Sequence, residues 1–132
     1  MFEILVKKDL TPNITLMEVT APRLASSANP GQFLIVRADE NGERIPLTIC
    51  DYDRQKGSVT IVTQKVGASS KKICDLEQGG HFQDVSGPLG RPSDFMAESD
   101  EMLKGKRFVF IAGGLGTAPV YPQAKYLHSK GA

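Results

Sequence analysis

The chain has 132 residues, which is room for one domain of ordinary size but not for two complete ones. Hydrophobic residues make up 40% of it and charged residues 23%, a composition typical of globular domains that excludes the disordered and fibrous classes. Sixteen basic residues against fifteen acidic ones leave a net charge of +1 without a long block of either sign, which argues against nucleic acid and anionic lipid as partners.

The N-terminal segment, residues 1–8, alternates as a strand does and lacks the basic region, long apolar run and cleavage site of a signal peptide. No apolar stretch approaches the roughly 20 residues that cross a bilayer. We therefore expect a cytoplasmic protein without a membrane partner. Cys50 and Cys74 form neither a C-x-x-C motif nor a metal-ligand spacing, so we expect two buried reduced thiols and no metal site.

Turn formers interrupt residues 1–90 about every eight to twelve positions, and the runs between them are rich in Val, Ile, Thr and Phe, a pattern that predicts a mainly β domain. The predicted strands are 2–8, 14–20, 32–38, 45–51, 58–64 and 82–85. Asn41-Gly42 lies between two of them, as in a hairpin. Such strands hide their edges by closing into a barrel or sandwich. One short helix, at about Ser70 to Glu77, interrupts them.

The C-terminal part has a different character. Residues 94–106 are polar and predict a connector or marginal helix, whereas Phe108 to Ala112 is continuously apolar, as in a strand buried on both faces of a parallel sheet. A glycine turn at 113–116 then leads into a helix from Thr117 or Ala118 to Lys130, with Pro119 in its first turn. This order predicts the first strand and helix of a doubly wound nucleotide-binding domain.

One parallel strand and one helix cannot form a sheet, because the pairing needs the strand that follows the helix. We therefore expect the chain to be an N-terminal fragment, with a β domain over residues 1–100 and an incomplete nucleotide-binding domain over 101–132.

The run Arg44-Ile45-Pro46-Leu47-Thr48 offers the groups that a flavin needs. Thr48 supplies a hydrogen-bonding hydroxyl for the ring atom N5, Pro46 and Leu47 supply an apolar wall, and the planar cation of Arg44 suits a diphosphate. The alternative is a strand with an exposed arginine and a proline at an edge or bulge.

A second segment, Gly67-Ala68-Ser69-Ser70, places small residues and two hydroxyls at a predicted helix start. Free amides there, aided by the positive end of the helix dipole, suit a diphosphate. The alternative is ordinary helix capping.

Two glycine turns complete the set. Gly87-Pro88-Leu89-Gly90 follows a predicted strand and is by itself an ordinary tight turn. Gly113-Gly114-Leu115-Gly116-Thr117 lies between a buried strand and a helix, where phosphate-binding turns occur. It departs from the G-x-G-x-x-G pattern, because Pro119 stands where the third glycine would be.

The four segments, in this order, resemble the ferredoxin-NADP reductase superfamily. Within it the chain is similar to the small flavin subunit of NADH-dependent ferredoxin:NADP oxidoreductase, also called sulfide dehydrogenase. It is also similar to the electron-transfer subunit of dihydroorotate dehydrogenase. The resemblance covers essentially the whole chain.

The resemblance implies a six-stranded antiparallel Greek-key barrel that binds FAD, followed by a domain that binds NAD or NADP. It makes Thr48 the catalytic residue, at flavin N5, with Arg44, Pro46, Leu47, Gly67, Ala68, Ser69 and Ser70 as further FAD-binding residues. Gly113, Gly114, Gly116 and Thr117 would bind the nicotinamide nucleotide. It further implies a [2Fe-2S] cluster, held by cysteines outside this chain, a larger catalytic subunit, and a ferredoxin or iron-sulfur electron carrier as partner.

The chain departs from the wider superfamily in two places: Arg44 lies four residues before the hydroxyl rather than three, and Leu47 fills an aromatic position. Three functions stay open: an electron-transfer flavoprotein subunit, the same subunit serving dihydroorotate oxidation, and a non-catalytic β-barrel binding module. NAD and NADP also stay open, because the residues that distinguish them lie about 20 positions beyond the glycine turn. We expect this chain alone to be inactive.

Overall fold

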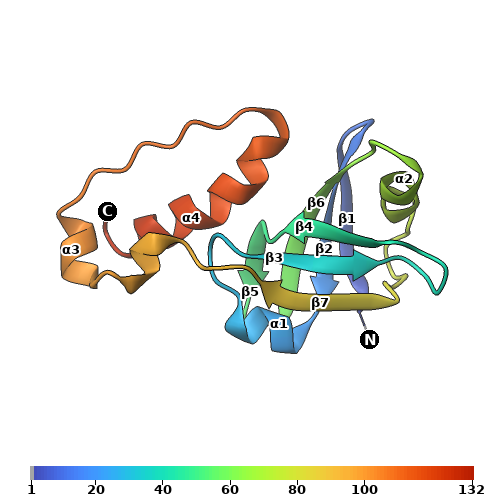
Figure 1. The fold of residues 1–132 in the computed structure, drawn as a ribbon, viewed down its shortest axis with the longest axis horizontal. Coiled ribbons are helices and arrows are strands. Elements are labelled where there is room, and N and C mark those ends of the chain that lie inside the picture. Colours follow the sequence, from blue (N-terminus) through green and yellow to red (C-terminus); the bar gives the residue numbers. More distant parts are fainter. Residues whose placement is uncertain (1) are drawn as a thin grey trace.

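The computed structural model of the protein describes residues 2–132, which contain seven strands and four α-helices (Figure 1). The strands are β1 Ile4–Thr11, β2 Ile14–Thr20, β3 Phe33–Arg37, β4 Arg44–Thr48, β5 Asp51–Asp53, β6 Ser58–Gln64 and β7 Asp84–Leu89. The helices are α1 Pro22–Ser27, α2 Ala68–Cys74, α3 Asp100–Lys104 and α4 Thr117–Ser129, with 3-10 turns η1 Asp94–Ala97 and η2 Gly114–Gly116.

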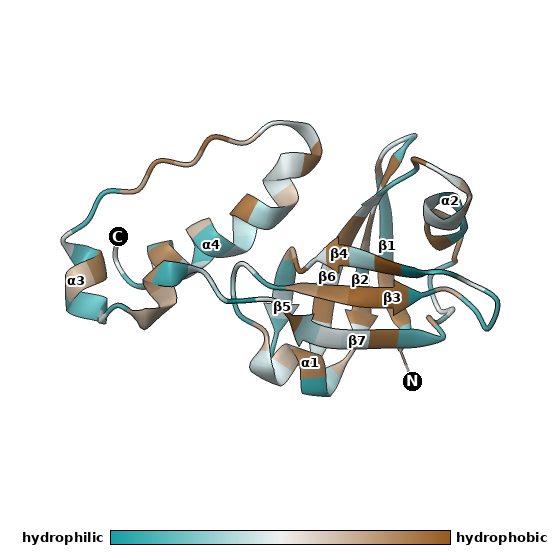
Figure 2. Ribbon diagram, in the orientation of Figure 1, coloured by the Kyte–Doolittle hydropathy of each residue, from teal (hydrophilic) through white to brown (hydrophobic). Residues whose placement is uncertain are grey.

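The strands form two antiparallel sheets, one in the order β1-β2-β6-β5 and one in the order β4-β3-β7. The strands β2 and β3 bury alternate residues, as period-two side-chain alternation requires. Met17 and Val19 of β2 and Leu34 and Val36 of β3 are at most 1% exposed, and Phe82 fills the space before β7. The core therefore lies between the two sheets, and Figure 2 shows hydrophobic residues on strands of both.

The expected closed six-stranded barrel is not what the strand pairing shows. Within residues 2–132 the ladders form two separate sheets, because the predicted strand 45–51 divides in the middle. The N–H of Ile49 donates to the carbonyl oxygen of Gln32 (3.2 Å), whereas the N–H of Cys50 donates to that of Thr60 (2.9 Å). The chain thus leaves the β3 sheet and joins the β6 sheet within one residue, and β4 stays an edge strand.

Several local predictions are confirmed. The observed β2 and β6 have the predicted bounds, and the hairpin between β3 and β4 turns at Asn41-Gly42, with a 3.0 Å hydrogen bond from the Gly42 N–H to the Asp39 carbonyl. The sequence reading missed α1, a single short helix that opens with Pro22 and buries Leu24 and Ala25. It also placed α2 two residues too late.

The predicted strand at Phe108–Ala112 is wrong for this chain. These residues are not in a sheet, because a parallel strand needs a neighbour and residues 2–132 supply none. The segment runs beside α4 (Figure 1), and Val109 and Ile111 are 80% and 93% exposed. The helix that follows it is confirmed, with Pro119 in its first turn.

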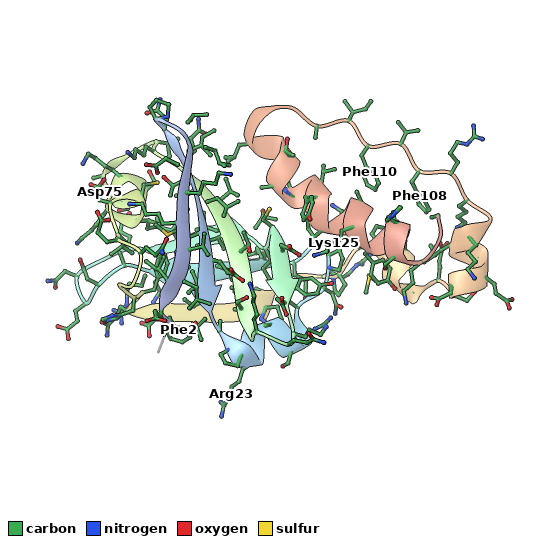
Figure 3. The ribbon with its side chains drawn as sticks, turned by 180° about the vertical axis from the view of Figure 1, so that it is seen from behind. Phe2, Arg23, Asp75, Phe108, Phe110 and Lys125 are labelled. Carbon is green, nitrogen blue, oxygen red and sulfur yellow. The ribbon has the colours of Figure 1, made fainter. Side chains whose placement is uncertain are left out.

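Aromatic and aliphatic contacts hold the C-terminal part together. The ring of Phe95 lies 6.2 Å from that of Phe108 and stacks on that of Tyr126 at 5.8 Å. Figure 3 shows Phe108 and Phe110 on the side of the segment that faces α4. Leu103 and Leu127 are also buried. None of the helices in the described part of the chain is both long and apolar enough to cross a membrane.

Candidate functional site

The outward face of β4 presents three of the predicted residues in a row. Arg44, Pro46 and Thr48 alternate with Ile45 and Leu47, which pack against the core. Across the ladder Thr48 pairs with Phe33 and Pro46 pairs with Ile35, so half-buried apolar side chains stand beside both. Leu47 faces the opposite way from Pro46, and the two therefore do not form a single wall.

The hydroxyl of Thr48 stands at the end of this row. It is half-buried, and no protein hydrogen bond to it is present within residues 2–132. Pro46 occupies an edge strand, where its missing N–H breaks no ladder hydrogen bond. The edge of β4 thus keeps backbone and side-chain groups that a ligand can contact.

At the other end of β4, Arg44 is held loosely. Its guanidinium lies 3.7 Å from the Asp84 carboxylate, which already accepts two hydrogen bonds from Arg37, at 2.5 and 2.9 Å. The Arg44 side chain is 56% exposed. Because Asp84 is committed to Arg37, the Arg44 cation is available to an anionic ligand.

The hairpin that precedes β4 packs against the start of α2, which brings two of the predicted segments together. The hydroxyl of Ser69 donates to the Glu43 carboxylate at 2.6 Å, and Lys72 pairs with Asp39 at 2.5 Å. Glu43 is the residue directly before Arg44. The arginine and the helix start, which are far apart in the sequence, are therefore neighbours in the fold.

Ser70 has a structural role at this helix start. Its hydroxyl oxygen accepts hydrogen bonds from the N–H groups of Val66 (2.8 Å) and Gly67 (3.0 Å), and the hydroxyl donates to the Gly67 carbonyl (3.1 Å). Ser70 therefore shapes the loop and is not free for a ligand. The next amides, of Ala68 and Ser69, belong to the first helical turn and have no intrahelical acceptor.

A cleft of about 630 Å³ separates the outer face of the β1-β2-β6-β5 sheet from the start of α4. The sheet side is mostly apolar and contains Leu10, Thr11, Ile14, Leu16, Thr60 and Val62, together with Cys50 and Asp51; the opposite side contains Gly114, Leu115, Thr117, Ala118 and Tyr121. Its volume lies in the range of pockets that bury small ligands.

The cleft includes some predicted residues and omits others. Gly114 and Thr117 line it, whereas Gly113, Gly116 and Thr48 do not. Thr48 precedes Cys50 by two residues, so β4 leads directly to the cleft. Burial, and to a smaller extent the neighbouring Asp51 carboxylate, raise the pKa of the Cys50 thiol above its ordinary value.

The sequence reading missed the apolar side of the cleft, although β2 carried a signal for it. Ile14 and Leu16 make the outward face of this strand apolar and line the cleft, while Thr15 and Met17 on the other face are buried. A strand with one solvated face alternates apolar and polar residues. No group of three or more His, Cys, Asp or Glu side chains in the described range is placed to hold a metal ion.

Comparison with known proteins shows what the chain is similar to. No protein-family model matches it. It is 56% identical over 131 residues to an uncharacterized protein of the adh 3′ region of Clostridium beijerinckii, covering 99% of this chain and 44% of that protein. It is 34% identical over 129 residues to a dihydroorotate dehydrogenase B (NAD(+)) electron transfer subunit homolog of Thermotoga maritima, covering 98% of this chain and 43% of that protein.

Solved structures agree with these relatives. The fold matches the NADH-dependent reduced ferredoxin-NADP oxidoreductase studied for flavin-based electron bifurcation, with a TM-score of 0.83 and 31% identity over 99% of this chain and 45% of that one. These relatives and structures match the ferredoxin-NADP reductase superfamily. Phthalate dioxygenase reductase, another match, has a TM-score of 0.73 and 26% identity over 98% of this chain and 40% of its own. The chain thus spans less than half the length of these superfamily members.

Proposed function

We propose that the chain binds FAD along β4 and serves as part of an electron-transfer subunit that passes electrons between NAD(P)H, FAD and an iron-sulfur centre or ferredoxin. The observation that carries the proposal is the position of β4. One end lies beside the start of α2, through the 2.6 Å contact of Ser69 with Glu43, and the other leads through Cys50 to a cleft that also contains the glycine turn. The strand spans about 13 Å between Arg44 and Thr48.

The diphosphate end has a suitable set of donors. The Arg44 guanidinium, the Ala68 and Ser69 amides and the close backbone approach allowed at Gly67, where an added Cβ meets no atom within 4 Å, all support an anionic ligand. Ser70 acts indirectly, by holding the loop.

At the ring end, the proposal gives the Thr48 hydroxyl to the flavin N5 position and the Pro46 ring to one face of the flavin. Leu47 then supports the strand from the core side instead of touching the ring. FAD supplies the chemistry when bound, accepting a hydride and releasing electrons singly, and the chain's residues hold it in position and exclude water. Gly114 and Thr117 would meet the nicotinamide nucleotide across the cleft, with Gly113 and Gly116 shaping the turn.

The proposed organisation follows from these roles. Residues 1–100 are the FAD-binding domain, with the two sheets as the halves of a flattened barrel. Residues 101–132 are the start of a doubly wound nucleotide-binding domain. The exposed apolar face at Val109 and Ile111 supports this, because a first strand of a parallel sheet is covered on both faces once the sheet is complete.

Two partner assignments follow from the relatives. The Thermotoga maritima relative is named an electron transfer subunit homolog of dihydroorotate dehydrogenase B, which makes a larger catalytic subunit of that enzyme the second candidate. The phthalate dioxygenase reductase structure is described as transferring electrons from pyridine nucleotides to [2Fe-2S], which supports an iron-sulfur acceptor. In either assignment the FAD site is the same.

Titration of the purified chain with FAD, followed by quenching of flavin fluorescence, tests the proposal. We expect Thr48→Ala to weaken binding about 5- to 10-fold, the loss of one hydrogen bond of about 1 kcal/mol, and Thr48→Ser to retain it. Thr20→Ala, at the end of β2, is the matched control and should bind as the unmodified chain does. A chain that takes up no FAD, or a Thr48→Ala variant that binds equally well, would favour the non-catalytic module.

A further inference from the structure

An ion pair joins the segment that follows β4 to the helix that follows the glycine turn. The Lys125 ammonium donates to both oxygens of the Asp51 carboxylate, at 2.9 and 3.1 Å. Asp51 begins β5, three residues after Thr48, and Lys125 lies on α4, where Figure 3 labels it. The two partners therefore belong to the two sides of the cleft.

Asp51 lies between two cavities. It lines the 630 Å³ cleft and also a smaller cavity of about 150 Å³ formed with Tyr52, Pro122 and Lys125. Its carboxylate additionally accepts a hydrogen bond from the Tyr52 N–H at 2.9 Å, which fixes its orientation. Asp51 is thus a rigid anchor on the sheet side, next to the ring end of β4.

Lys125 and Thr117 lie on the same helix, eight residues apart, a distance of about 12 Å. Pro122 lies between them and removes one backbone hydrogen bond of the helix, but α4 is continuous from Thr117 to Ser129, so a shift of Lys125 is transmitted to Thr117 and Ala118, which line the cleft. A second contact, between the Ser93 hydroxyl and the Gln123 side chain at 3.0 Å, lies near the same part of α4. This contact, together with the stacking of Tyr126 on Phe95, also holds α4 in place.

We propose that Asp51 and Lys125 are positioning residues whose ion pair sets the width of the cleft between the flavin strand and the nucleotide turn. This inference rests on the proposed function for its meaning in catalysis, since the width of the cleft fixes the approach of a nicotinamide to the flavin. Its structural content, that the pair controls the opening of the cleft, does not depend on FAD.

The hydrogen bond to Asp51 raises the pKa of the Lys125 ammonium, so Lys125 is charged throughout the neutral range. The pair is partly exposed, with 54% of the Lys125 side chain and 29% of the Asp51 side chain accessible. Its contribution therefore corresponds to a two- to five-fold change in the ratio of closed to open cleft, not to a loss of the fold.

Cys50 gives a direct measure of cleft opening, because it lines the cleft and is only 9% exposed. The chain without ligand is treated with iodoacetamide, and the labelling rates of Cys50 and Cys74 are read separately by peptide mass spectrometry. We expect Lys125→Met to label Cys50 two- to five-fold faster. The unpaired Asp51 carboxylate by itself would raise the Cys50 pKa further and slow the reaction, so acceleration reports access.

Two variants complete the test. Lys125→Arg, which keeps a cation opposite Asp51, should label as the unmodified chain does. Lys71→Met removes the 2.8 Å Lys71–Asp75 pair on α2 and is the matched control. Cys74, 2% exposed and away from the cleft, should react equally slowly in every variant.

The proposal is overturned if Cys50 in Lys125→Met is labelled no faster than in the unmodified chain. It is also overturned if Cys74 is accelerated to the same extent, because that would indicate a general loosening of the fold. FAD titration of the same variants separates the two hypotheses. Faster Cys50 labelling without FAD binding by any variant would refute the proposed function but leave the role of the ion pair in place.

Discussion

Replacing Arg54 with methionine should destabilise the protein by about 2.5–3 kcal/mol. The guanidinium of Arg54 donates to three carbonyl oxygens at the end of α1, those of Ala25 (2.8 Å), Ser26 (2.7 Å) and Ala28 (3.0 Å). It also lies over the Tyr52 ring at 4.8 Å. The side chain thus fastens α1, which links the two sheets, to the turn between β5 and β6.

The magnitude follows from these contacts. A hydrogen bond to a charged donor contributes about 1.5–3 kcal/mol where it is shielded, and two of the three acceptors are partly buried. Because Arg54 itself is exposed, each of these two bonds is discounted to about 1 kcal/mol, and the third is assigned nothing. The cation–π contact adds about 0.5–1 kcal/mol. Methionine keeps the length of the apolar stem.

Urea unfolding followed by far-UV circular dichroism and tyrosine fluorescence measures the change, since the chain has no tryptophan. Arg91→Met is the matched control, because Arg91 pairs with Asp94 in an exposed contact, and it should leave the urea midpoint unchanged. A free energy of unfolding for Arg54→Met within about 0.5 kcal/mol of the unmodified chain would refute the assignment.

Two further outcomes are expected. Gly90→Ala should destabilise the protein more than Gly79→Ala. Both glycines have positive φ (+81° and +88°), but a Cβ at Gly90 would lie 3.0 Å from the Phe33 ring, whereas one at Gly79 meets nothing within 4 Å. Equal urea midpoints for the two variants would contradict this. Backbone N–H groups of Lys56 and Gln55 lower the pKa of Asp53, so its stabilisation is present above about pH 4 and lost as the pH falls through the folded-state pKa. The difference in urea midpoint between the unmodified chain and Asp53→Ala should therefore shrink in acid, and a constant difference would show that no such linkage exists.

The elements that the sequence predicted well are those determined by local signals. The strands at 14–20 and 58–64 lie between turn formers and carry their own alternation, and Asn41-Gly42 fixes a hairpin on its own. The sequence did not predict the helix α1, because six residues are too few for a helical period to repeat. Its stability comes from burial of Leu24 and Ala25 and from Arg54, which is distant in sequence.

The site could be predicted as a set of segments but not as an arrangement. The segments around Arg44, Gly67 and Gly114 are all visible in the sequence, yet the contact of Ser69 with Glu43 and the cleft between Leu16 and Thr117 depend on how the sheets and α4 pack. The sequence likewise predicted Ser70 as a cofactor-binding residue, but in the structure its hydroxyl forms three hydrogen bonds within its own loop. Tertiary packing decides which polar groups remain free.

The failure at Phe108–Ala112 has a different cause. The segment is apolar as the sequence indicates, but only part of it is buried: Phe108 packs on Phe95, while Val109 and Ile111 are exposed. A strand, however, is a property of a pair of segments, and its hydrogen bonds require a neighbour. The sequence of one segment therefore predicts its tendency to form a strand, and the rest of the sheet determines whether the tendency is satisfied.

The change of sheet at Ile49 and Cys50 connects the fold to the proposed chemistry. In an uninterrupted strand Thr48 and Cys50 would lie on one face and Asp51 on the other. Here the Ile49 amide still bonds to the β3 side and the Cys50 amide already bonds to β6, so the backbone turns between Thr48 and Asp51. Thr48 thus stays at the end of the edge strand while Asp51 reaches Lys125 on the nucleotide helix. The same turn that prevents closure of the barrel leaves β4 accessible and joins it to the cleft, so a substitution that straightened it would affect the cofactor strand and the ion pair together.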